Sequence, residues 1–231
     1  MSDCNVIAPF GPLIYTTDIS EEFHQFLLDG LDDCRKAQDA RNRLVGNIDK
    51  QRFAPYDPTK FTKFLDPHLI NYLNEKHKRH NRIKDVCNDK QVEWDAYKSV
   101  VRYNLGRGPW VNFQQKGEFN PLHNHGGIVS AVLFIKIPHE LDEERKNCNY
   151  TAKASGCLEF VHSNQHIVVK PREATLYLFP AYLQHAVYPY HSDVERISMS
   201  FNFDEVVIDD FPIPGPNDDP TFYGTDPTQD P

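Results

Sequence analysis

Two histidines one residue apart, His123 and His125, form the segment of this sequence best suited to metal chemistry. Side chains of a strand alternate between its two faces, so both imidazoles would point the same way if the segment is extended. His185 follows an apolar run, residues 176–180, and could add a third imidazole from another strand. Imidazole suits Fe, Zn, Cu and Ni, and three ligands on one face leave positions open for exogenous molecules. The spacing therefore predicts a metal centre capable of catalysis.

Other histidines compete with His185 for the third position: His139, His162, His166 and His191. His162 and His166 flank an expected hairpin turn, where exposure is more common than metal ligation. His191 directly follows a predicted strand end at Tyr188–Tyr190 and is the stronger rival. We therefore expect His185 as the third ligand, with His191 as the alternative.

A second polar cluster lies on a predicted strand in which residues 196, 198, 200 and 202 share one face. Such a face is either wet on a half-exposed strand or lines an aqueous pocket inside a barrel. Arginine is the side chain best shaped to hold a carboxylate with two parallel hydrogen bonds, and a serine hydroxyl can add a third. The pocket interpretation makes Arg196 and Ser198 candidates for carboxylate binding. The same alternation on neighbouring predicted strands places Tyr103, Asn112 and Gln114 at the pocket mouth.

Two amphipathic helices are predicted in the N-terminal part of the chain. The first should span about 19–41, with Asp18 as N-cap and Glu21 completing a capping box before apolar residues at helical spacing. The second should begin near Phe64 and reach the basic run Lys76–His80. We interpret this run as a solvated helix end rather than as a nucleic-acid patch.

From about residue 92 the sequence changes to β-branched and aromatic runs bounded by Gly and Pro, which is the pattern of strands. The predicted strands are 94–104, 109–115, 121–125, 128–137, 156–161, 165–170, 174–179, 184–190 and 195–203. Many short strands without intervening helices favour a sandwich or a jelly-roll barrel. The expected fold is therefore mainly β with N-terminal helices, and the polar stretch 139–155 interrupts it as an insertion.

Three parts of the chain are expected. Residues 1–92 should supply a short strand, within 10–18, and helices that support the barrel. Residues 93–208 should form the β core that carries the candidate site. Residues 209–231 are rich in Pro and Asp and bury too little apolar surface to offset the entropy of ordering, so we expect an extended or disordered tail.

The bulk composition describes a globular chain of one domain, with 231 residues of which 39% are hydrophobic and 25% are charged. A formal charge of −8 argues against general nucleic-acid binding, which depends on clustered Lys and Arg. The five cysteines are scattered without a C-x-x-C pair, and we interpret them as reduced thiols. Neither a signal-peptide pattern nor a membrane-length apolar run is present in the sequence, so the expected location is the cytoplasm, without a membrane contact.

Taken together, these motifs resemble those of the 2-oxoglutarate and Fe(II) dependent oxygenases. That superfamily has an H-x-[D/E] pair on one strand, a distal His on another strand, and an Arg or Lys further along, often as R-x-S. The corresponding residues here are His123-Asn-His125, His185 and Arg196-Ile-Ser198. The wider sequence pattern of residues 95–205 is similar to that of oxygenases from phages and bacteria. If the protein is of phage origin, the expected compartment is the host cytoplasm.

Several expectations follow from this resemblance. It implies a double-stranded β-helix, a cupin-like jelly roll, in which Fe(II) is held by His123, His125 and His185. The cosubstrate 2-oxoglutarate would chelate the iron and place its distal carboxylate on Arg196 and Ser198, and O2 would take the remaining position. The implied reaction hydroxylates a small-molecule or peptide substrate, which the motifs do not identify, and releases succinate and CO2.

The metal ligands depart from the family pattern at one position, where His125 replaces the usual carboxylate. Three neutral imidazoles leave one more unit of positive charge at the metal than two imidazoles and a carboxylate. Three-histidine iron sites do occur in related barrel folds. Glu118 and Glu159 are the alternatives for a carboxylate ligand if one strand is displaced.

Two other classes of protein compete with an oxygenase. A cupin-type metal enzyme would not use 2-oxoglutarate, and its first motif, G-x5-H-x-H, is matched from Gly117 to His125. The glutamate expected three or four residues later is missing, because those positions hold Val129 and Ser130. A non-catalytic barrel that acts in protein interaction is the second alternative, and the acidic, proline-rich tail would suit docking.

Overall fold

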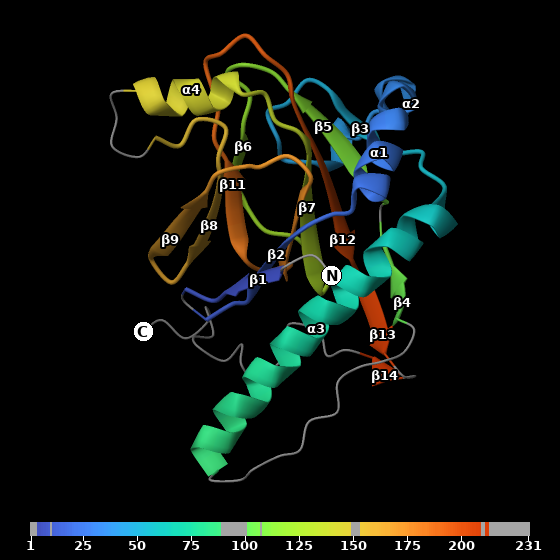
Figure 1. Ribbon diagram of the computed structural model, residues 1–231, viewed down its shortest axis with the longest axis vertical. Helices are drawn as coiled ribbons and strands as arrows, with labels where there is room; N and C mark the ends of the chain where they lie inside the picture. Colours follow the sequence, from blue (N-terminus) through green and yellow to red (C-terminus); the bar gives the residue numbers. More distant parts are fainter. Residues whose placement is uncertain are drawn as a thin grey trace.

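The computed structural model describes residues 4–9, 11–88, 101–106, 108–148, 153–208 and 211–212 (Figure 1). The strands are β1 (Cys4–Ile7), β2 (Ile14–Asp18), β3 (Gln51–Phe53), β4 (Val101–Asn104), β5 (Trp110–Gln114), β6 (Asn120–His123), β7 (Val129–Lys136), β8 (Leu158–His162), β9 (Gln165–Val169), β10 (Thr175–Pro180), β11 (Gln184–Val187), β12 (Arg196–Phe203), β13 (Glu205–Ile208) and β14 (Phe211–Pro212). The helices are α1 (Glu21–Asp29), α2 (Leu31–Lys36), α3 (Pro58–Asn88) and α4 (Glu140–Asn147), with a 3-10 turn at Arg41–Arg43.

Two sheets of antiparallel strands form the body of the molecule. The larger sheet has the order β1-β2-β10-β7-β12-β5-β3, and the smaller has the order β6-β11-β8-β9. From β5 to β12 the chain alternates between the sheets, except that β8 and β9 form a hairpin within the smaller one. The central strands β5-β12-β7-β10 and the four strands of the smaller sheet therefore make a double-stranded β-helix, which confirms the fold class predicted from the sequence.

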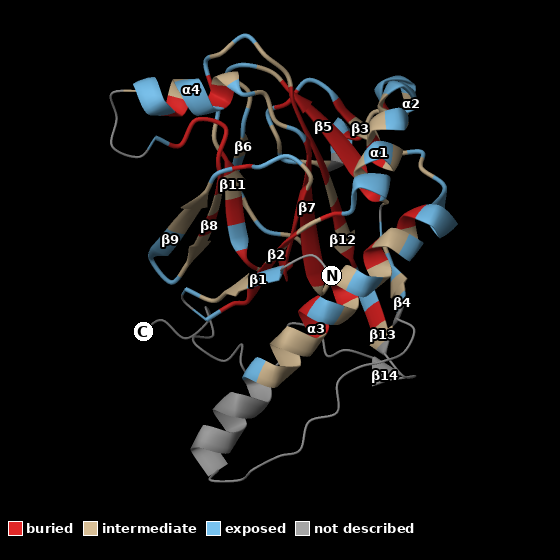
Figure 2. Cartoon of the chain, viewed as in Figure 1, coloured by how far each residue is buried: buried red, intermediate tan, exposed pale blue. Residues whose placement is uncertain are grey.

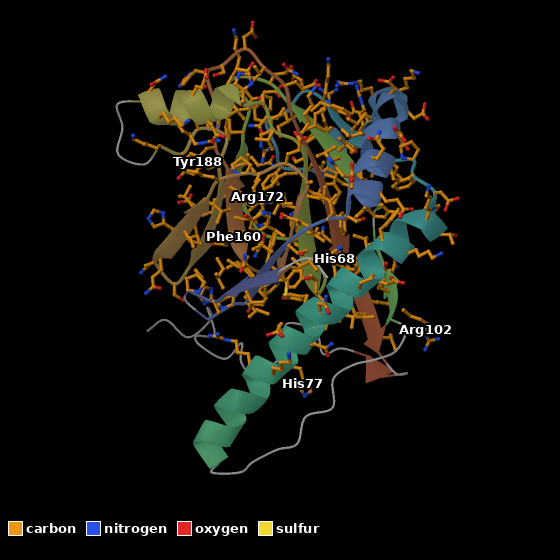
Figure 3. All side chains as sticks on the ribbon, in the orientation of Figure 1. His68, His77, Arg102, Phe160, Arg172 and Tyr188 are labelled. Carbon is orange, nitrogen blue, oxygen red and sulfur yellow. The ribbon has the colours of Figure 1, made fainter. Side chains whose placement is uncertain are left out.

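The two sheets meet in an apolar contact, formed by β7 and β10 of the larger sheet and by β8 and β11 of the smaller sheet. Phe134 and Phe179 from the larger sheet pack with Leu158 and Phe160 from the smaller one (Phe160 is labelled in Figure 3). Buried residues run along β5, β7 and β12 in Figure 2, so these strands form the centre of the molecule. The apolar contact between the sheets closes one end of the space between them and leaves the other end for polar side chains.

The opposite face of the larger sheet is covered by helices α1 and α3 (Figure 1). Met199 and Phe201 of β12 pack into this layer with Phe23 of α1 and Phe61 of α3. Because side chains alternate along a strand, the residues between them, such as Ser198, point to the interior of the barrel. One side of β12 therefore faces the helices and the other faces the pocket. Of the two interpretations of its polar face, the structure agrees with the one that places it in a pocket.

The N-terminal helices differ from their predicted bounds. The expected helix over 19–41 is two helices, α1 and α2, divided at Gly30, where a Cβ would overlap the ring of Tyr56. The N-cap is Ser20, whose hydroxyl accepts a hydrogen bond from the Phe23 amide (3.2 Å), and the predicted cap Asp18 belongs to β2. The cap was misassigned because Asp18 is still part of β2, so the helix begins two residues later than the capping-box pattern indicated.

The second helix, α3, is longer at both ends than predicted. It begins at Pro58 and continues through Pro67 to Asn88, so the basic run Lys76–His80 lies within the helix and not at its end. The packed face repeats at three- and four-residue spacing, with Phe61, Leu65, Leu69 and Tyr72 buried. Among the described residues no helix is long and apolar enough to cross a membrane.

Most predicted strands agree with observed strands within two residues. The strand expected at 184–190 ends at Val187, shortly before Pro189, which cannot donate to a ladder. The strand expected at 94–104 is described only from Val101. The insertion at 139–155 contains α4, and the expected tail is described only at β14, which pairs with β13. The rest of the tail lies outside the described residues.

The N-terminal part contributes more to the sheet than the single strand that was expected. Strands β1 and β2 extend one edge of the larger sheet beyond β10, and β3 extends the other edge beside β5. The loop from Leu44 to Ile48, just before β3, passes close to β6, because Asn47 forms a two-way backbone bridge with Phe119. This placement brings residues before position 92 to the candidate site.

Candidate metal and cosubstrate site

The three predicted metal ligands come from three neighbouring places on the smaller sheet. His123 is the last residue of β6, and its direct cross-strand partner is His185 of β11. His125 lies beyond the end of β6, where its backbone amide donates to Ala181 O (2.9 Å). The expectation that His123 and His125 share a strand face is therefore wrong. The loop, held by the turn between β10 and β11, still returns His125 to the other two rings.

The three imidazoles converge on one point. Their ring centroids are 4.9 Å (His123 to His125), 4.3 Å (His123 to His185) and 5.1 Å (His125 to His185) apart. One nitrogen from each ring lies within 4.8 Å of the others. Nitrogens that each stand at about 2.1 Å from a cation lie roughly 3–4 Å from one another, so a small closure of the rings would complete a three-nitrogen site.

Backbone carbonyls orient two of the rings. His123 Nδ1 lies 2.6 Å from Pro121 O, and His185 Nδ1 lies 2.9 Å from Leu183 O. A carbonyl oxygen only accepts, so each Nδ1 carries the proton and donates. Nε2 is then the lone-pair nitrogen that remains for a metal, which is the usual second-shell arrangement of histidine ligands. The local fold thus fixes the tautomer that metal binding requires.

Burial keeps the rings neutral. Desolvation lowers the pKa of His123, and it lowers the pKa of His185 well below its ordinary value. Desolvation, reinforced by the nearby His123, lowers the pKa of His125 to about 4. Metal ligation needs the deprotonated imidazole, so proton competition at this site is weak near neutral pH.

The rival ligands identified from the sequence lie elsewhere. The backbone amide of His191 donates to the Glu144 carboxylate (3.0 Å), and His166 pairs with Glu159 (2.6 Å). The carboxylate of Glu118 accepts from the backbone amides of Asp49 and Gln115 (2.9 and 2.7 Å). Within the described residues, the cluster of potential metal ligands around His185 contains histidines alone.

At the other end of the same cavity lies Arg196, which is 1% exposed. Its Nη1 donates to Gln114 Oε1 (2.8 Å) and to Ser198 Oγ (3.4 Å), and its guanidinium lies 4.9 Å from the centroid of the Phe134 ring. Nε and Nη2 are buried and have no hydrogen-bond partner among the residues that the structure describes. Burial lowers the pKa of Arg196 to about 10, so the group stays charged at neutral pH. Two donors on one edge of a buried cation fit a carboxylate in the paired geometry typical of arginine.

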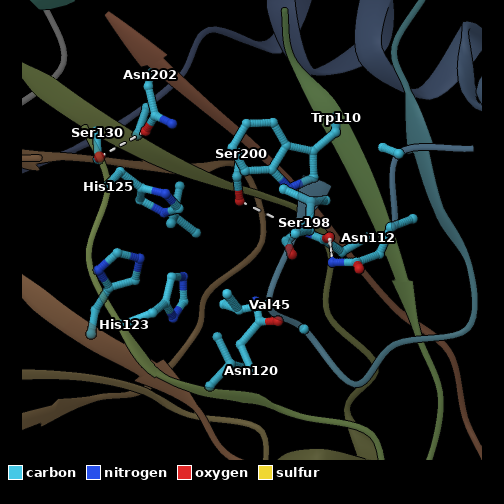
Figure 4. Close-up of a pocket in the computed structure, with 18 of the residues that line it drawn as sticks. Val45, Trp110, Asn112, Asn120, His123, His125, Ser130, Ser198, Ser200 and Asn202 are labelled. Atoms are coloured by element: carbon cyan, nitrogen blue, oxygen red, sulfur yellow. Dashed lines mark hydrogen bonds between the residues drawn. The ribbon is translucent and has the colours of Figure 1, made fainter. Parts of the chain in front are cut away.

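A cavity of about 420 Å³ joins the two ends (Figure 4). His123 and His125 stand on one side of it in this view, and Asn112 and Ser198 stand on the other. Of the three residues expected at the mouth, Asn112 does line the cavity, whereas Gln114 lies behind Arg196 as its acceptor. Tyr103 is not among the lining residues.

Tyr103 was placed wrongly because β4 belongs to another sheet. That strand pairs with β13 in the order β14-β13-β4, apart from the larger sheet. The Tyr103 hydroxyl donates to Asp66 Oδ1 of α3 (2.8 Å), and the Tyr103 ring packs edge-on against Phe203. Counting alternation from the neighbouring strand could not reveal that β4 had left the barrel.

Other polar or aromatic residues of the cavity wall were not singled out from the sequence: Gln51, Trp110, Asn120 and Asp204. Ser200 and Asn202, which share the polar face of Arg196 and Ser198, also line it, as alternation along β12 had indicated. Gln51 reaches the cavity only through the pairing of β3 with β5. No local sequence motif marks this residue, so tertiary pairing alone could have found it.

Comparison with known proteins gives one family match and several distant structural likenesses. Residues 108–202 match the model of the family described as "Putative 2OG-Fe(II) oxygenase". No curated protein matches the chain significantly. The matched segment contains both ends of the cavity described above.

The structural likenesses are all at low sequence identity. A prolyl-4-hydroxylase from Pseudomonas putida is 15% identical, with a TM-score of 0.41, over 88% of this chain and 93% of that one. A prolyl hydroxylase from Trichoplax adhaerens, solved with a hypoxia inducible factor peptide fragment, is 14% identical, with a TM-score of 0.41, over 87% and 83%. HygX from Streptomyces hygroscopicus, solved with nickel, 2-oxoglutarate and hygromycin B, is 11% identical, with a TM-score of 0.46, over 84% and 82%.

The family that matches this chain uses Fe(II), 2-oxoglutarate and O2, and its members are oxidoreductases. The side chains present fit two of these groups, because three neutral imidazoles face one point and a buried guanidinium has two unused donors. The resemblance seen in the motifs is therefore confirmed for the segment that carries the site: residues 108–202 match the 2OG-Fe(II) oxygenase family.

Proposed function

We propose that this protein is an Fe(II) and 2-oxoglutarate dependent dioxygenase that hydroxylates its substrate and releases succinate and CO2. The observation that carries the proposal is the unpaired guanidinium edge of Arg196, buried in the same cavity as the three histidines. A buried charge without a partner is strongly destabilising, and natural proteins retain one mainly where a ligand completes it. An anion that reaches both ends of the cavity satisfies the histidine end and the arginine end together.

The residues divide the work between them. His123, His125 and His185 would hold Fe(II) through the nitrogens that the backbone carbonyls leave free. Arg196 and Ser198 would hold the distal carboxylate of 2-oxoglutarate. When bound, the metal and cosubstrate supply the oxidative chemistry with O2. The protein orients them and excludes water from the charged contact at Arg196.

The absence of a carboxylate in this ligand set has an electrostatic consequence. A set of three neutral imidazoles leaves the full charge of the cation uncompensated by the protein, so anionic exogenous ligands are attracted more strongly. The 2-oxoglutarate dianion provides that compensation. Glu118 and Glu159, whose carboxylates are engaged elsewhere, do not supply it.

The buried arginine also separates this proposal from the two rival classes. A cupin that does not use 2-oxoglutarate has no need for a carboxylate receptor at Arg196. A barrel acting only in protein interaction has no need for either end of the cavity. Neither alternative explains why two guanidinium donors are kept without partners.

The test is an anaerobic titration of the Fe(II)-loaded protein, read by the charge-transfer absorbance of the chelated keto acid. Pyruvate is the matched control, because it has the keto acid but lacks the distal carboxylate. We expect 2-oxoglutarate to bind about 100-fold more tightly, since a paired guanidinium–carboxylate contact contributes roughly 3 kcal/mol. Succinate should then form when O2 is admitted.

Equal affinity for the two keto acids would reject the assignment of Arg196. Iron binding without any keto acid signal would favour a cupin. A protein that binds neither iron nor 2-oxoglutarate would favour the interaction barrel, so metal analysis accompanies the titration.

A further inference from the structure

We infer that the substrate presents an uncharged group with N–H or O–H donors, of which a primary amide is the simplest, to the side-chain oxygens of Gln51 and Asn120. The inference rests on the proposed function, because it concerns the part of the cavity that Fe(II) and 2-oxoglutarate do not use. Gln51 and Asn120 would then determine specificity rather than catalysis. Gln51 lies outside the matched segment 108–202, and Asn120 lies within it without being one of the predicted ligands.

Gln51 is a buried amide with one end unused. It lies on β3 opposite Asn112 of β5 and is 1% exposed. Its Nε2 donates to Asn112 Oδ1 (2.8 Å), and Asn112 Nδ2 in turn donates to Ser200 Oγ (3.5 Å). This chain of hydrogen bonds runs across three adjacent strands and directs Gln51 Nε2 toward Asn112. Within the described part of the chain, Gln51 Oε1 remains buried in the cavity wall without a hydrogen-bond partner.

Asn120 supplies a second acceptor of the same kind. It lies at the start of β6 and lines the cavity, and its Oδ1 is also buried with no partner from the described residues. A Cβ at Gly46 would overlap Asn120 Oδ1 and come within 2.9 Å of Gln51 Nε2, so the two amides approach each other beneath the loop at Leu44–Ile48. Only glycine at position 46 allows the loop to pass so close to these amides.

Leaving two buried acceptors unsatisfied is costly. Each unmade hydrogen bond of this kind costs about 1–3 kcal/mol, and native structures seldom keep them without a reason. A ligand that donates to both oxygens recovers that free energy. A ligand that carries only acceptors, such as a carboxylate, would be repelled by them.

The charges of the cavity support an uncharged group. Among the described lining residues, Arg196 and Asp204 are the ones with a formal charge at neutral pH. Arg196 is assigned to the cosubstrate, and Asp204 is exposed, with its carboxylate close to Gly106 and Gly127. The polar neighbours of Gln51 in the described structure are uncharged: the amides of Asn112 and Asn120, and the Ser200 hydroxyl beyond Asn112. Desolvating an ionic group there would bring no opposite charge in return.

The test compares three probes of nearly equal shape: propionamide, propionate and propylamine. Saturation-transfer NMR would measure their binding to the full chain loaded with Zn(II) and 2-oxoglutarate, because Zn(II) avoids both turnover and paramagnetic broadening. We expect propionamide to bind at about millimolar affinity, typical of so small a ligand, and the two ions to bind at least tenfold more weakly.

Two variants connect the preference to the acceptors. Gln51→Met and Asn120→Leu should each weaken propionamide binding about tenfold, which corresponds to one lost hydrogen bond of roughly 1.4 kcal/mol. Gln25→Met is the matched control, since Gln25 is an exposed glutamine on α1 and does not line the cavity. It should leave the affinity unchanged.

Several results would overturn the inference. If propionate bound as tightly as propionamide, the substrate group would not need to be uncharged. A preference for propylamine would indicate that Asp204, and not the two amides, recognises the substrate. An unchanged affinity in Gln51→Met and Asn120→Leu, or no propionamide binding to the loaded wild type, would also overturn the inference. The proposed function is judged separately by 2-oxoglutarate affinity, which these variants should retain and which also shows that they fold.

Discussion

The two ends of the cavity differ in charge, since one is formed by neutral side chains and the other by a buried cation. At the metal end, on the smaller sheet, three imidazoles are neutral because burial lowers the pKa of each. Backbone carbonyls satisfy the Nδ1 protons of two of them. At the other end, on β12 of the larger sheet, Arg196 is buried with its charge and with two donors unsatisfied.

The difference shows where the fold has given up stability. The metal end is largely complete in its polar contacts before a cation arrives, and binding there costs little reorganisation. The arginine end keeps a desolvated cation that the ligand must complete, so its contribution to folding is unfavourable. Stability and binding are therefore expected to change in opposite directions at Arg196, and this contrast can be tested by substitution.

The largest expected effect is at the metal end. His185→Ala should reduce Fe(II) affinity by more than the roughly 100-fold that changes to second-shell groups can cost, because it removes a ligand itself. The keto acid charge-transfer band should disappear with the metal. His191→Ala is the matched control and should keep both, as measured by metal analysis and absorbance.

The next effect is at the arginine end. Arg196→Met should lower 2-oxoglutarate affinity about 100-fold and leave metal content unchanged, because the charged contact is lost while the histidines stay. Arg172→Met, at an exposed arginine paired with Asp18, is the control. A variant that loses iron as well would show that the two ends are not independent.

The same variant makes the stability contrast measurable. The free energy of unfolding of the ligand-free Arg196→Met protein should be higher than that of the wild type by about 1 kcal/mol or more, because an uncompensated buried charge is replaced by an apolar side chain. Denaturant unfolding would measure it. A clear loss of stability would mean that Gln114 and Ser198 already compensate the charge.

A smaller effect is expected at Ser198. Its contact with Arg196 Nη1 is long, at 3.4 Å, and its hydroxyl would add one hydrogen bond to the cosubstrate carboxylate. Ser198→Ala should therefore weaken 2-oxoglutarate binding about fivefold, in line with roughly 1 kcal/mol. A loss as large as that of Arg196→Met would show that the hydroxyl positions the guanidinium.

The smallest effect on metal content is expected for His125→Asp. A carboxylate oxygen also serves Fe(II), and His125 lies in a loop where the shorter side chain can adjust. The variant should retain its iron, measured against His185→Ala, which should not. Loss of iron in His125→Asp would count against His125 as a ligand.

The sequence by itself determined the strand pattern and the chemistry of the site. Alternation along β12 separated Met199 and Phe201, which pack on the helices, from Arg196 and Ser198, which line the cavity. This worked because period-two alternation is a local property of the backbone. The residue types at His123, His125 and His185 likewise restricted the chemistry that the candidate site can support.

Tertiary structure decided the rest, because pairing between distant segments leaves no local mark. His125 lies off the strand and is returned by a backbone bond to Ala181. Tyr103 leaves the barrel with β4, whereas Gln51 joins it through β3. Strand partners are chosen by packing over the whole domain, and that choice placed two unused amide oxygens in the same cavity as the candidate metal site that the histidine motifs had indicated.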